Sequence, residues 1–571
     1  MKRIINFCLV IISLNAMAQT QLFIPDTLVG PNYTLNMHKD SIQFFPLGNK
    51  SKTYAYNLNK YLGPTLIFNK GTNVNIAVNN QIGDTTTVHW HGIHLPSKWD
   101  GGPHTSIMPS ASWNPTFTVM DNAATYWYHP HMHMKTAVQA IKGAAGLIIV
   151  RDPIEAALNL PRRYGVDDFP LIVQCQQYDV GNQAMPLGMQ DSTILVNGAR
   201  ANYGYTVNAN CPAQIVRMRI LNASGERSFN FGFTANKSFK IITSDGGLLN
   251  APVTLTRLRL APGERAEILL DLNGMNGQTI YLRSYASELP IGIQGGPTMP
   301  MPAGSPPMDS PLNGIDFNIM RINVVSQTAS PVTTIPTSLT TNAVYTPSMA
   351  SVTRTIRFTA DSLMVMDGPF YFNDSTFNMM RIDYEIPLNS IEIWKLVNET
   401  MVAHPFHIHD VQFYLFDRSG SAPPAEELGR KDVVLVPPFD SVMFITKFED
   451  FADTLIPFMF HCHILMHEDD GMMGQFIVKP NIVGISEASL NNSTVKIYPN
   501  PAKDVVNIKI DVADITQPFQ LKVYDVMGKM VYSSTLTQLQ SSINTHSWAK
   551  GVYTIELIQN NNSIHKKIII E

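Results

Sequence analysis

The sequence has few charged residues, and after its first eighteen residues it has no long apolar run. Only 15% of its 571 residues are charged, against about 25% in an average soluble protein. The formal net charge is −4, from 41 basic and 45 acidic residues. No cationic surface large enough to hold a phosphate backbone is expected, which argues against nucleic acid as a partner. A membrane span needs ~18–20 apolar residues, so we expect none.

The start of the chain is the exception. Residues 1–18 read MKRIINFCLVIISLNAMA, with two basic residues, an apolar run and small residues at Ala16 and Ala18. This combination is typical of a secretory signal peptide. We therefore expect cleavage after Ala18, export from the cytoplasm and a mature chain that begins at Gln19.

Cysteine is scarce. Cys8 leaves with the signal peptide, and Cys175, Cys211 and Cys462 remain. An odd number leaves at least one thiol unpaired. Cys175 and Cys211 lie in neighbouring strand-like segments, so in an oxidising environment they could form a disulfide. Two separate buried thiols are the alternative, and the sequence does not decide between them.

Proline and glycine are frequent, with 38 and 35 residues spread along the chain. Between them lie short runs rich in Val, Ile, Thr, Phe and Tyr, such as NVNIAVNN, RAEILLDL and SVMFITKF. This spacing is typical of β-sandwiches. At ~150 residues per domain, the length predicts about four domains. Pro-rich stretches at 151–170 and 292–347 divide the first 480 residues into three blocks.

The composition changes after Pro480, where Asn and Ser become frequent and a separate β-sandwich of about 80 residues is expected. Three separated pieces resemble the C-terminal sorting domain recognised by type IX secretion systems of Bacteroidetes. The resemblance implies that residues 490–571 are an address for the type IX secretion machinery and take no part in the chemistry. The pieces are Tyr498-Pro499-Asn500-Pro501, Val523-Tyr524-Asp525-x-x-Gly528 and Gly551-Val552-Tyr553.

The histidines fall in two groups, and none lies between His133 and His404. A metal site built from both groups must lie between the first and third blocks, with the middle block as a spacer. Four pairs share the spacing His-x-His, and side chains two apart on an extended chain point to the same side. Imidazoles without a cysteine or a carboxylate suit copper. The pairs are His89 and His91, His129 and His131, His407 and His409, and His461 and His463.

A second set of ligands points the opposite way. Cys462 lies between two paired histidines, so its sulfur points away from both imidazoles. His404 stands outside the pairs and can face the same way. With His467 and the thioether of Met472 or Met473, they form a His₂Cys set with a weak axial Met, which is typical of blue-copper electron-transfer sites. One stretch of backbone thus joins both sets.

The motifs HWHG, YHPHMH, HPFHIH and HCHILMHEDDGMM stand in the order found in three-domain multicopper oxidases. From about Tyr33 to Pro480 the chain resembles this family, most closely its bacterial laccases, cuprous oxidases and bilirubin oxidases. The resemblance implies an all-β fold of three consecutive cupredoxin-like Greek-key β-sandwiches, followed by the small C-terminal one. The implied boundaries are 19–155, 156–330 and 331–482 for the cupredoxin domains and 490–571 for the sorting domain.

Carried over residue by residue, the resemblance implies four coppers per chain. A lone His-x-His pair is most often a coincidence, but four pairs in the family's order are not. Of the two adjacent methionines, Met472 matches the family's axial position. The type 1 copper would be bound by His404, Cys462, His467 and Met472, the type 2 copper by His89 and His407, and the type 3 pair by His91, His129, His131, His409, His461 and His463.

Two acids stand beside these motifs. Asp100, in KWDGG, resembles the family's acid near the type 2 copper, and Glu468 resembles the acid that serves the type 3 pair. Reduction of dioxygen to water consumes protons, which a positioned carboxylate can supply. Both acids are therefore expected to be catalytic, and Cys462 is expected to carry electrons between the two sites. For each acid the alternative is a solvated loop carboxylate.

The sequence therefore predicts a laccase-like multicopper oxidase, secreted or displayed on the outer cell surface after transit through the periplasm. It would oxidise diphenols and related donors with dioxygen as the acceptor. Phenols, aromatic amines, bilirubin-like pigments and metal ions all remain possible donors. Laccase-like activity is preferred because no long Met- or His-rich insertion is present.

The same residues leave three alternatives to this prediction. A cuprous or other metal-ion oxidase in copper tolerance is the first. A copper-sequestering surface protein would not need the imidazole set or acids beside it, and four His-x-His pairs argue against a copper nitrite reductase. The stretch GGPTMPMPAGSPPMDS, with Met299, Met301 and Met308, is interpreted as a linker in preference to a Cu(I)-binding insertion.

Overall fold

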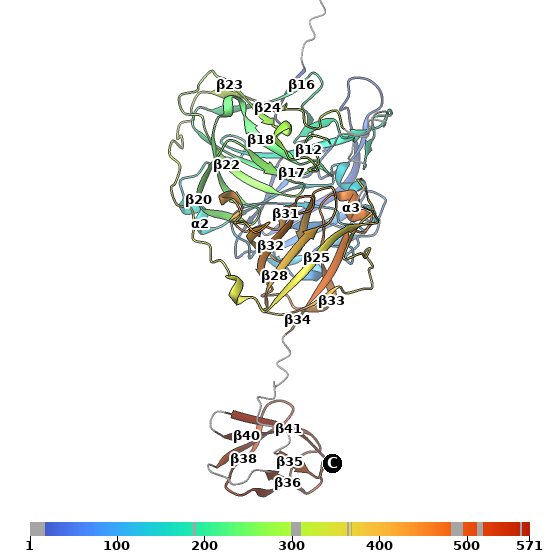
Figure 1. The fold of residues 1–571 in the computed structure, drawn as a ribbon, viewed down its shortest axis with the longest axis vertical. Helices are drawn as coiled ribbons and strands as arrows, with labels where there is room; N and C mark the ends of the chain where they lie inside the picture. The colour runs from blue at the N-terminus through green and yellow to red at the C-terminus, as the bar shows by residue number, and fades with distance from the viewer. Residues whose placement is uncertain are drawn as a thin grey trace, which may run out of the picture. The chain divides into compact units, whose positions relative to one another are not determined.

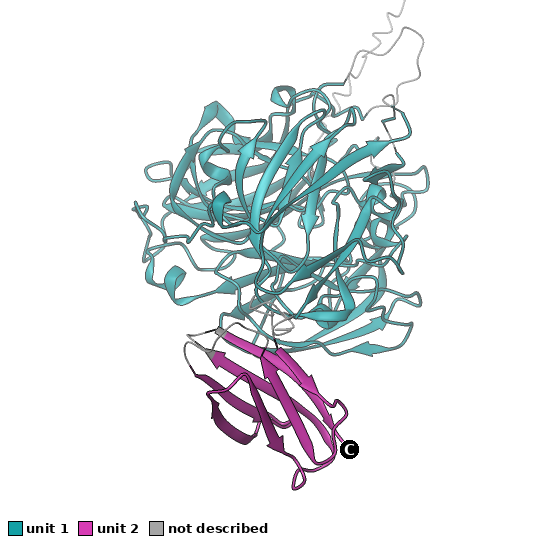
Figure 2. Ribbon diagram, turned by 60° about the horizontal axis from the view of Figure 1, so that its bottom comes forward, with its two compact units in different colours: residues 1–480 teal, residues 481–571 magenta. Residues whose placement is uncertain are grey.

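The computed structural model describes residues 18–186, 190–298, 310–362, 365–366, 368–480, 495–510, 518–559 and 562–571. The predicted signal segment before Ala18 and the methionines Met299, Met301 and Met308 lie outside these residues. The chain divides into two compact units, residues 1–480 and 481–571 (Figure 2). Strands make up 49% of the structure and helices 6%, so the predicted all-β fold is confirmed. Among the described residues, no helix is long and apolar enough to cross a membrane.

The first unit contains three β-sandwiches, and the first of them is built around strand β3. Along β3, buried residues Tyr33, Leu35 and Met37 alternate with more exposed ones, as expected for a strand with one face on a core. The two sheets have the strand orders β2-β5-β11-β10-β7 and β4-β3-β6-β8, and β9 also pairs with β6. The bounds are β2 Thr27–Val29, β3 Asn32–Ile42, β4 Ser51–Tyr56, β5 Thr65–Asn69, β6 Asn73–Gln81, β7 His89–His91, β8 Ser112–Trp113, β9 Thr116–Thr118, β10 Thr125–His129 and β11 Gly146–Arg151.

The middle sandwich has sheets in the orders β1-β16-β24-β23-β18-β21 and β15-β14-β12-β17-β22-β19-β20, with β13 paired to β12. Its core contains Cys175 and Cys211 as separate free thiols, so the structure has no disulfide between them. Strand β1 pairs in parallel with β16, which adds residues Ala18–Gln21 to this sandwich. The bounds are β1 Ala18–Gln21, β12 Asp168–Tyr178, β13 Ala184–Met185, β14 Thr193–Val196, β15 Ala199–Arg200, β16 Tyr205–Pro212, β17 Ile215–Asn222, β18 Phe229–Phe233, β19 Phe239–Ser244, β20 Gly247–Leu255, β21 Leu258–Leu260, β22 Arg265–Asp271, β23 Thr279–Ser284 and β24 Phe317–Val325.

The third sandwich has an aromatic core around the buried Trp394, whose ring lies about 6 Å from those of Phe406, Phe444 and Phe460. Its sheets have the orders β26-β25-β28-β32-β30 and β27-β34-β33-β29-β31. In Figure 1 its yellow-to-orange strands occupy a different region of the unit from the green strands of the middle sandwich. The bounds are β25 Val352–Ala360, β26 Phe370–Phe372, β27 Tyr384–Pro387, β28 Ile391–Asn398, β29 His404–Ile408, β30 Tyr414–Arg418, β31 Val433–Val436, β32 Ser441–Lys447, β33 Asp453–Cys462 and β34 Met473–Lys479.

Helices are short and occur mainly in connections. The carboxylate of Asp469, on α3, accepts hydrogen bonds from the backbone N–H groups of Thr136 and Ala137 in the first turn of α1. This contact joins the first sandwich to the third. The bounds are α1 Thr136–Ile141, α2 Pro153–Ala157, α3 Leu465–Asp469, and for the 3₁₀ turns η1 Ser97–Trp99, η2 Thr234–Asn236, η3 Ala286–Glu288, η4 Pro347–Met349 and η5 Ala425–Glu427.

The second unit is a small β-sandwich with its own apolar core, as predicted. Its sheets have the orders β35-β36-β39 and β38-β37-β40-β41. The turn between β37 and β38 carries Asp525, which accepts the Lys529 N–H, and Gly528 at φ +76°. The bounds are β35 Val495–Tyr498, β36 Val505–Ile510, β37 Phe519–Tyr524, β38 Met530–Leu536, β39 Gln540–Asn544, β40 Gly551–Gln559 and β41 Asn562–Ile570.

Candidate metal centre

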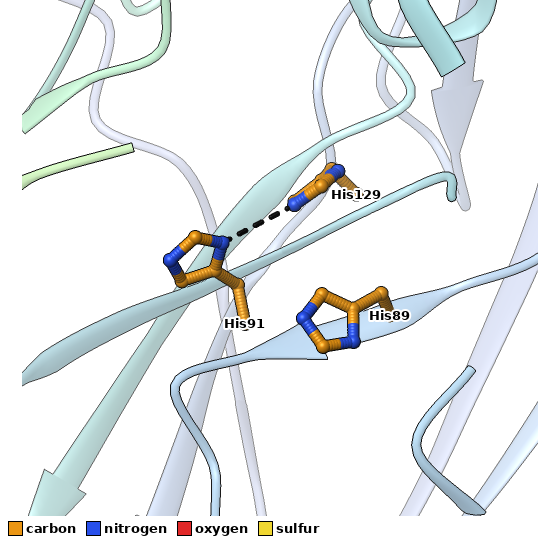
Figure 3. Close-up of side chains that lie close together, drawn as sticks. All are labelled: His89, His91 and His129. Carbon is orange, nitrogen blue, oxygen red and sulfur yellow. Dashed lines mark hydrogen bonds between the residues drawn. The ribbon is translucent and has the colours of Figure 1, made fainter. Parts of the chain in front are cut away.

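The eight paired histidines converge at the junction of the first and third sandwiches. His89 lies opposite His129 in the β7–β10 ladder, and His407 lies opposite His461 in the β29–β33 ladder. Figure 3 shows His89, His91 and His129 with their rings grouped together. Each of the eight is at most 1% exposed. We call them the imidazole cluster: His89, His91, His129, His131, His407, His409, His461 and His463.

Rings from the first and third sandwiches lie against one another in the imidazole cluster. The ring centroid of His463, in the third sandwich, lies 5.0 Å from that of His91, in the first. The His89 and His409 rings stack at 3.8 Å, as do those of His91 and His407, so rings of the first sandwich face rings of the third. Within each of three overlapping triplets, the ligand atoms lie within 4.8 Å of one another: His89, His91 and His129; His89, His407 and His409; His131, His409 and His461.

Several ring nitrogens of the imidazole cluster have no hydrogen-bond partner in the described structure. Burial lowers the pKa of His461 well below its usual value, and lowers that of His409 to about 4 and that of His463 to about 3. Buried nitrogens without a hydrogen-bond partner are costly unless something binds them. Metal ions would satisfy them, and copper suits imidazole donors. The unpartnered atoms include Nε2 of His89 and His407, and both ring nitrogens of His131 and His463.

The second set of ligands lies inside the third sandwich. The Cys462 Sγ is 3.6 Å from Nδ1 of His404 and 3.6 Å from Nδ1 of His467, and all three residues are buried. Met472 is fully buried in the same apolar cluster as Cys462. Nε2 of His404 lies 2.9 Å from the Thr400 hydroxyl, which leaves Nδ1 for the thiol side. This set of sulfur and imidazole nitrogen donors suits a metal ion that binds thiolate well, such as copper.

Asp100 and Glu468 both contact the imidazole cluster. Asp100 Oδ2 lies 2.7 Å from Nδ1 of His409, and Glu468 lies 3.3 Å from Nδ1 of His131 and 3.2 Å from Nδ1 of His461. The two acids are 2% and 1% exposed, so neither is a solvated loop carboxylate.

The pKa values of the two acids move in opposite directions. Burial raises the pKa of Glu468 well above its usual value. Burial alone would also raise the pKa of Asp100, but His409 and His89 lower it below its usual value. Burial therefore favours the protonated form of Glu468, while the neighbouring imidazoles favour the ionised form of Asp100.

Two residues that the sequence interpretation missed also belong here. Asp432, directly before β31, lies 3.1 Å from Nε2 of His91 through Oδ1, and its backbone oxygen lies 2.8 Å from Nδ1 of His407. Arg265 of β22 forms two hydrogen bonds with the Asp432 carboxylate. The middle sandwich is therefore more than a spacer. Asp432 stands outside every His motif in the sequence, so only the fold reveals this contact.

The remaining nearby histidines lie outside the metal-ligand groups found among the described residues. His94 lies 2.8 Å from Asp410 through Nδ1, and its side chain is 17% exposed. Nε2 of His104 lies 2.7 Å from the Gln475 side-chain oxygen. The His133 ring packs 5.1 Å from that of Phe377.

Family comparisons agree with this arrangement. Residues 39–155, 172–290 and 339–481 each match a model described as multicopper oxidase. Residues 496–571 match the model of a secretion system C-terminal sorting domain. The chain belongs to the multicopper oxidase family, which implies a copper-dependent oxidoreductase. Its C-terminal unit is a type IX secretion sorting domain, which implies export.

Individual relatives carry different names. A multicopper oxidase of Staphylococcus haemolyticus is 33% identical over 458 residues, covering 78% of this chain and 88% of that protein. The cell division protein FtsP of Escherichia coli strain K12 is 29% identical over 445 residues, covering 76% and 87%. A bacterial laccase-like multicopper oxidase, CueO of Ochrobactrum sp., has a TM-score of 0.70 and 31% identity, covering 80% of this chain and 100% of that one.

Proposed function

We propose that the protein is an exported, laccase-like oxidase that takes single electrons from a phenolic or similar reducing donor and reduces O₂ to water. One observation carries this proposal. Cys462 of the sulfur-containing set stands between His461 and His463 of the imidazole cluster, so two covalent backbone segments join the two sets. When bound, coppers in these sets would supply one-electron transfer from the donor and the reduction of dioxygen.

The geometry supports four coppers per chain. Separation of the sulfur-containing set from the imidazole cluster matches one type 1 site and one trinuclear site. The ligand atoms of His89 and His407 lie within 4.8 Å of each other, which supports a type 2 site held by these two residues. We assign His404, Cys462, His467 and Met472 to type 1, His89 and His407 to type 2, and His91, His129, His131, His409, His461 and His463 to type 3.

Asp100 and Glu468 are proposed to hold and deliver protons at the cluster. Burial favours the protonated form of Glu468, and its carboxyl oxygens lie 3.3 Å from Nδ1 of His131 and 3.2 Å from Nδ1 of His461. It can therefore give a proton at Oε1 or Oε2 beside His131 and His461. Asp100 accepts from the His409 ring, which fixes that imidazole and keeps a carboxylate beside the type 2 ligands.

The donor class is inferred from a relative. The Ochrobactrum relative is described as active towards lignin model compounds, which favours phenolic donors. Aromatic amines, bilirubin-like pigments, and Cu(I) or other metal ions are the alternative donors. Copper sequestration without turnover is disfavoured, because two buried acids contact the imidazoles.

We also propose the route that the protein takes. Residues 1–18 are removed as a Sec signal peptide, the protein crosses the periplasm, and the sorting domain directs it through type IX secretion to the medium or the outer surface. Domains at 19–155, 156–330, 331–482 and 490–571 accord with the three family matches and the sorting-domain match.

Parallel assays of the purified protein against a phenol, bilirubin, Cu(I) and Fe(II) test the donor class. We expect oxygen uptake with the phenol at a kcat/KM above that for either metal ion. A preference for Cu(I) or Fe(II) would make the protein a metal-ion oxidase, and no uptake with any donor would overturn the oxidase proposal.

A further inference from the structure

We infer that Asp432, held by Arg265 of the middle sandwich, is a positioning residue that selects which ring nitrogens the imidazole cluster offers to metal. This inference rests on the proposed function, because the cluster must hold metal. It gives the middle sandwich a direct part in building the site. Neither residue stands in a His motif.

The two nitrogens of His91 face different partners. Nδ1 lies 3.4 Å from Nε2 of His129, the contact dashed in Figure 3, and Nε2 lies 3.1 Å from Oδ1 of Asp432. Both Asp432 oxygens already accept from Arg265, so the carboxylate is the acceptor in this contact and we assign the His91 proton to Nε2. The Nδ1 lone pair is then directed into the cluster.

The same residue imposes the opposite choice on His407. The backbone oxygen of Asp432 accepts from Nδ1 of His407 at 2.8 Å, so Nε2 of His407 keeps its lone pair. That Nε2 is buried without a hydrogen-bond partner in the protein. The His91 and His407 rings stack with their centroids 3.8 Å apart. Asp432 therefore leaves Nδ1 free on the His91 ring and Nε2 free on the His407 ring stacked against it.

Arg265 fixes the carboxylate that makes this selection. Its two terminal nitrogens lie 2.5 and 2.6 Å from the two Asp432 oxygens, a bidentate pair. The guanidinium is itself held by the backbone oxygens of Thr125, Gly263 and Asp245, each at 3.1 Å. Thr125 belongs to the first sandwich and Asp432 to the third, so Arg265 ties all three sandwiches together beside the cluster.

Gly92 provides an independent observation. This residue follows His91 at φ +84°, and a Cβ there would lie 2.3 Å from Oδ2 of Asp432 and 2.7 Å from Nη2 of Arg265. A side chain would occupy the space of the ion pair. The glycine of the HWHG motif therefore leaves room for this pair.

The test is Asp432→Asn in the full-length protein. An amide keeps only one acceptor oxygen, so it cannot accept from both terminal nitrogens of Arg265 in the bidentate geometry, and one of its two orientations would present N–H to Nε2 of His91. Loss of a carboxylate that hydrogen-bonds a metal-binding histidine typically weakens metal binding ~10–100-fold. We expect copper to be lost from the imidazole cluster on dialysis against a chelator. Three quantities are measured: the copper content per chain, the type 2 electron paramagnetic resonance signal and the type 3 near-ultraviolet band. The blue type 1 band should remain.

Asp168→Asn is the matched control. Asp168 is buried in the middle sandwich, and its carboxylate accepts from Nε of Arg219 at 2.7 Å and from Nη2 of Arg219 at 2.9 Å, with no contact to Asp432, Arg265 or a histidine in the described structure. We expect this variant to melt at a lower temperature but to keep its cluster copper.

Equal copper retention by the Asp432→Asn and wild-type proteins would overturn the inference, as would equal copper loss from both variants. A wild-type protein without cluster copper would instead overturn the proposed function. If Asp432→Asn is insoluble, Arg265→Lys keeps the charge but loses the bidentate geometry, and unchanged cluster copper in it would also overturn the inference.

Discussion

Cys462 is the residue on which the two ligand sets depend most. Its side chain lies with His404 and His467 inside the third sandwich, while its neighbours His461 and His463 point into the imidazole cluster. Burial raises the pKa of the free thiol, so the protein alone does not produce a thiolate. Metal binding would have to displace the proton, because the thiolate is the form that binds metal.

Cys462→Ser should therefore abolish the blue colour and the oxidase activity. A hydroxyl group cannot form the copper–thiolate bond from which the colour arises. Visible absorption and copper content per chain are the measurements. The matched control is Cys175→Ser, which alters a buried thiol of the middle sandwich and should leave the blue band unchanged. A Cys462→Ser protein that stayed blue would place the type 1 site elsewhere.

Asp100→Asn and Glu468→Gln should keep copper and colour but slow turnover by roughly 10–100-fold. Both changes remove a proton-transferring group while leaving every proposed ligand in place. The loss should be largest at higher pH, where bulk water supplies fewer protons. The measurement is kcat across pH with the blue band as a control for loading. Unchanged rates at every pH would reduce both acids to structural roles.

At the scale of single elements, β22 joins the middle sandwich to the first. Arg265 and Glu267 lie two residues apart on this strand and face the same side. Glu267 accepts hydrogen bonds from Arg217, Arg219 and the Thr125 hydroxyl, and all of these residues are buried. The junction between sandwiches is thus a network of paired charges.

Glu267→Gln should destabilise the first unit by about 3–5 kcal/mol, because it leaves buried Arg217 and Arg219 undercompensated. Thermal melting monitored by circular dichroism is the measurement. Glu385→Gln is the control, since Glu385 is 59% exposed and pairs only with Lys479 among the described contacts. An exposed pair contributes about 0–1 kcal/mol. Similar melting temperatures for the two variants would show that the network does not hold the sandwiches together.

The elements differ in how far the sequence alone could predict them. Alternating buried and exposed residues, as on β3, and the period of two in the His-x-His pairs are local, so the all-β fold and the converging imidazoles were predictable. The pairing of β1 with β16 and the contact of Arg265 with Asp432 join residues far apart in the chain. Such contacts depend on how the sandwiches pack, and no local spacing signals them.

For the whole molecule, the central division is between the catalytic unit and the sorting unit. Every proposed ligand lies before Pro480, and the second unit has its own core of buried residues. Each unit should therefore fold without the other. We therefore expect the sorting unit to be needed for export and dispensable for the chemistry.

A chain ending near Val483 should fold, bind copper and oxidise a phenol at near full rate. In its native host the same truncation should leave the protein in the periplasm, because the type IX address is absent. Fractionation of cells making the full and shortened chains measures this. Normal export of the shortened chain would overturn the sorting role, and loss of its copper would show that the second unit supports the third sandwich.

Oxygen uptake by the purified, copper-loaded protein tests the central claim most directly. The electrode trace is compared with the phenol consumed, with catalase added to detect hydrogen peroxide. We predict that four electrons leave the donor for each dioxygen consumed, with no oxygen returned by catalase. A protein that binds copper in both ligand sets and consumes no oxygen with any donor would contradict the account.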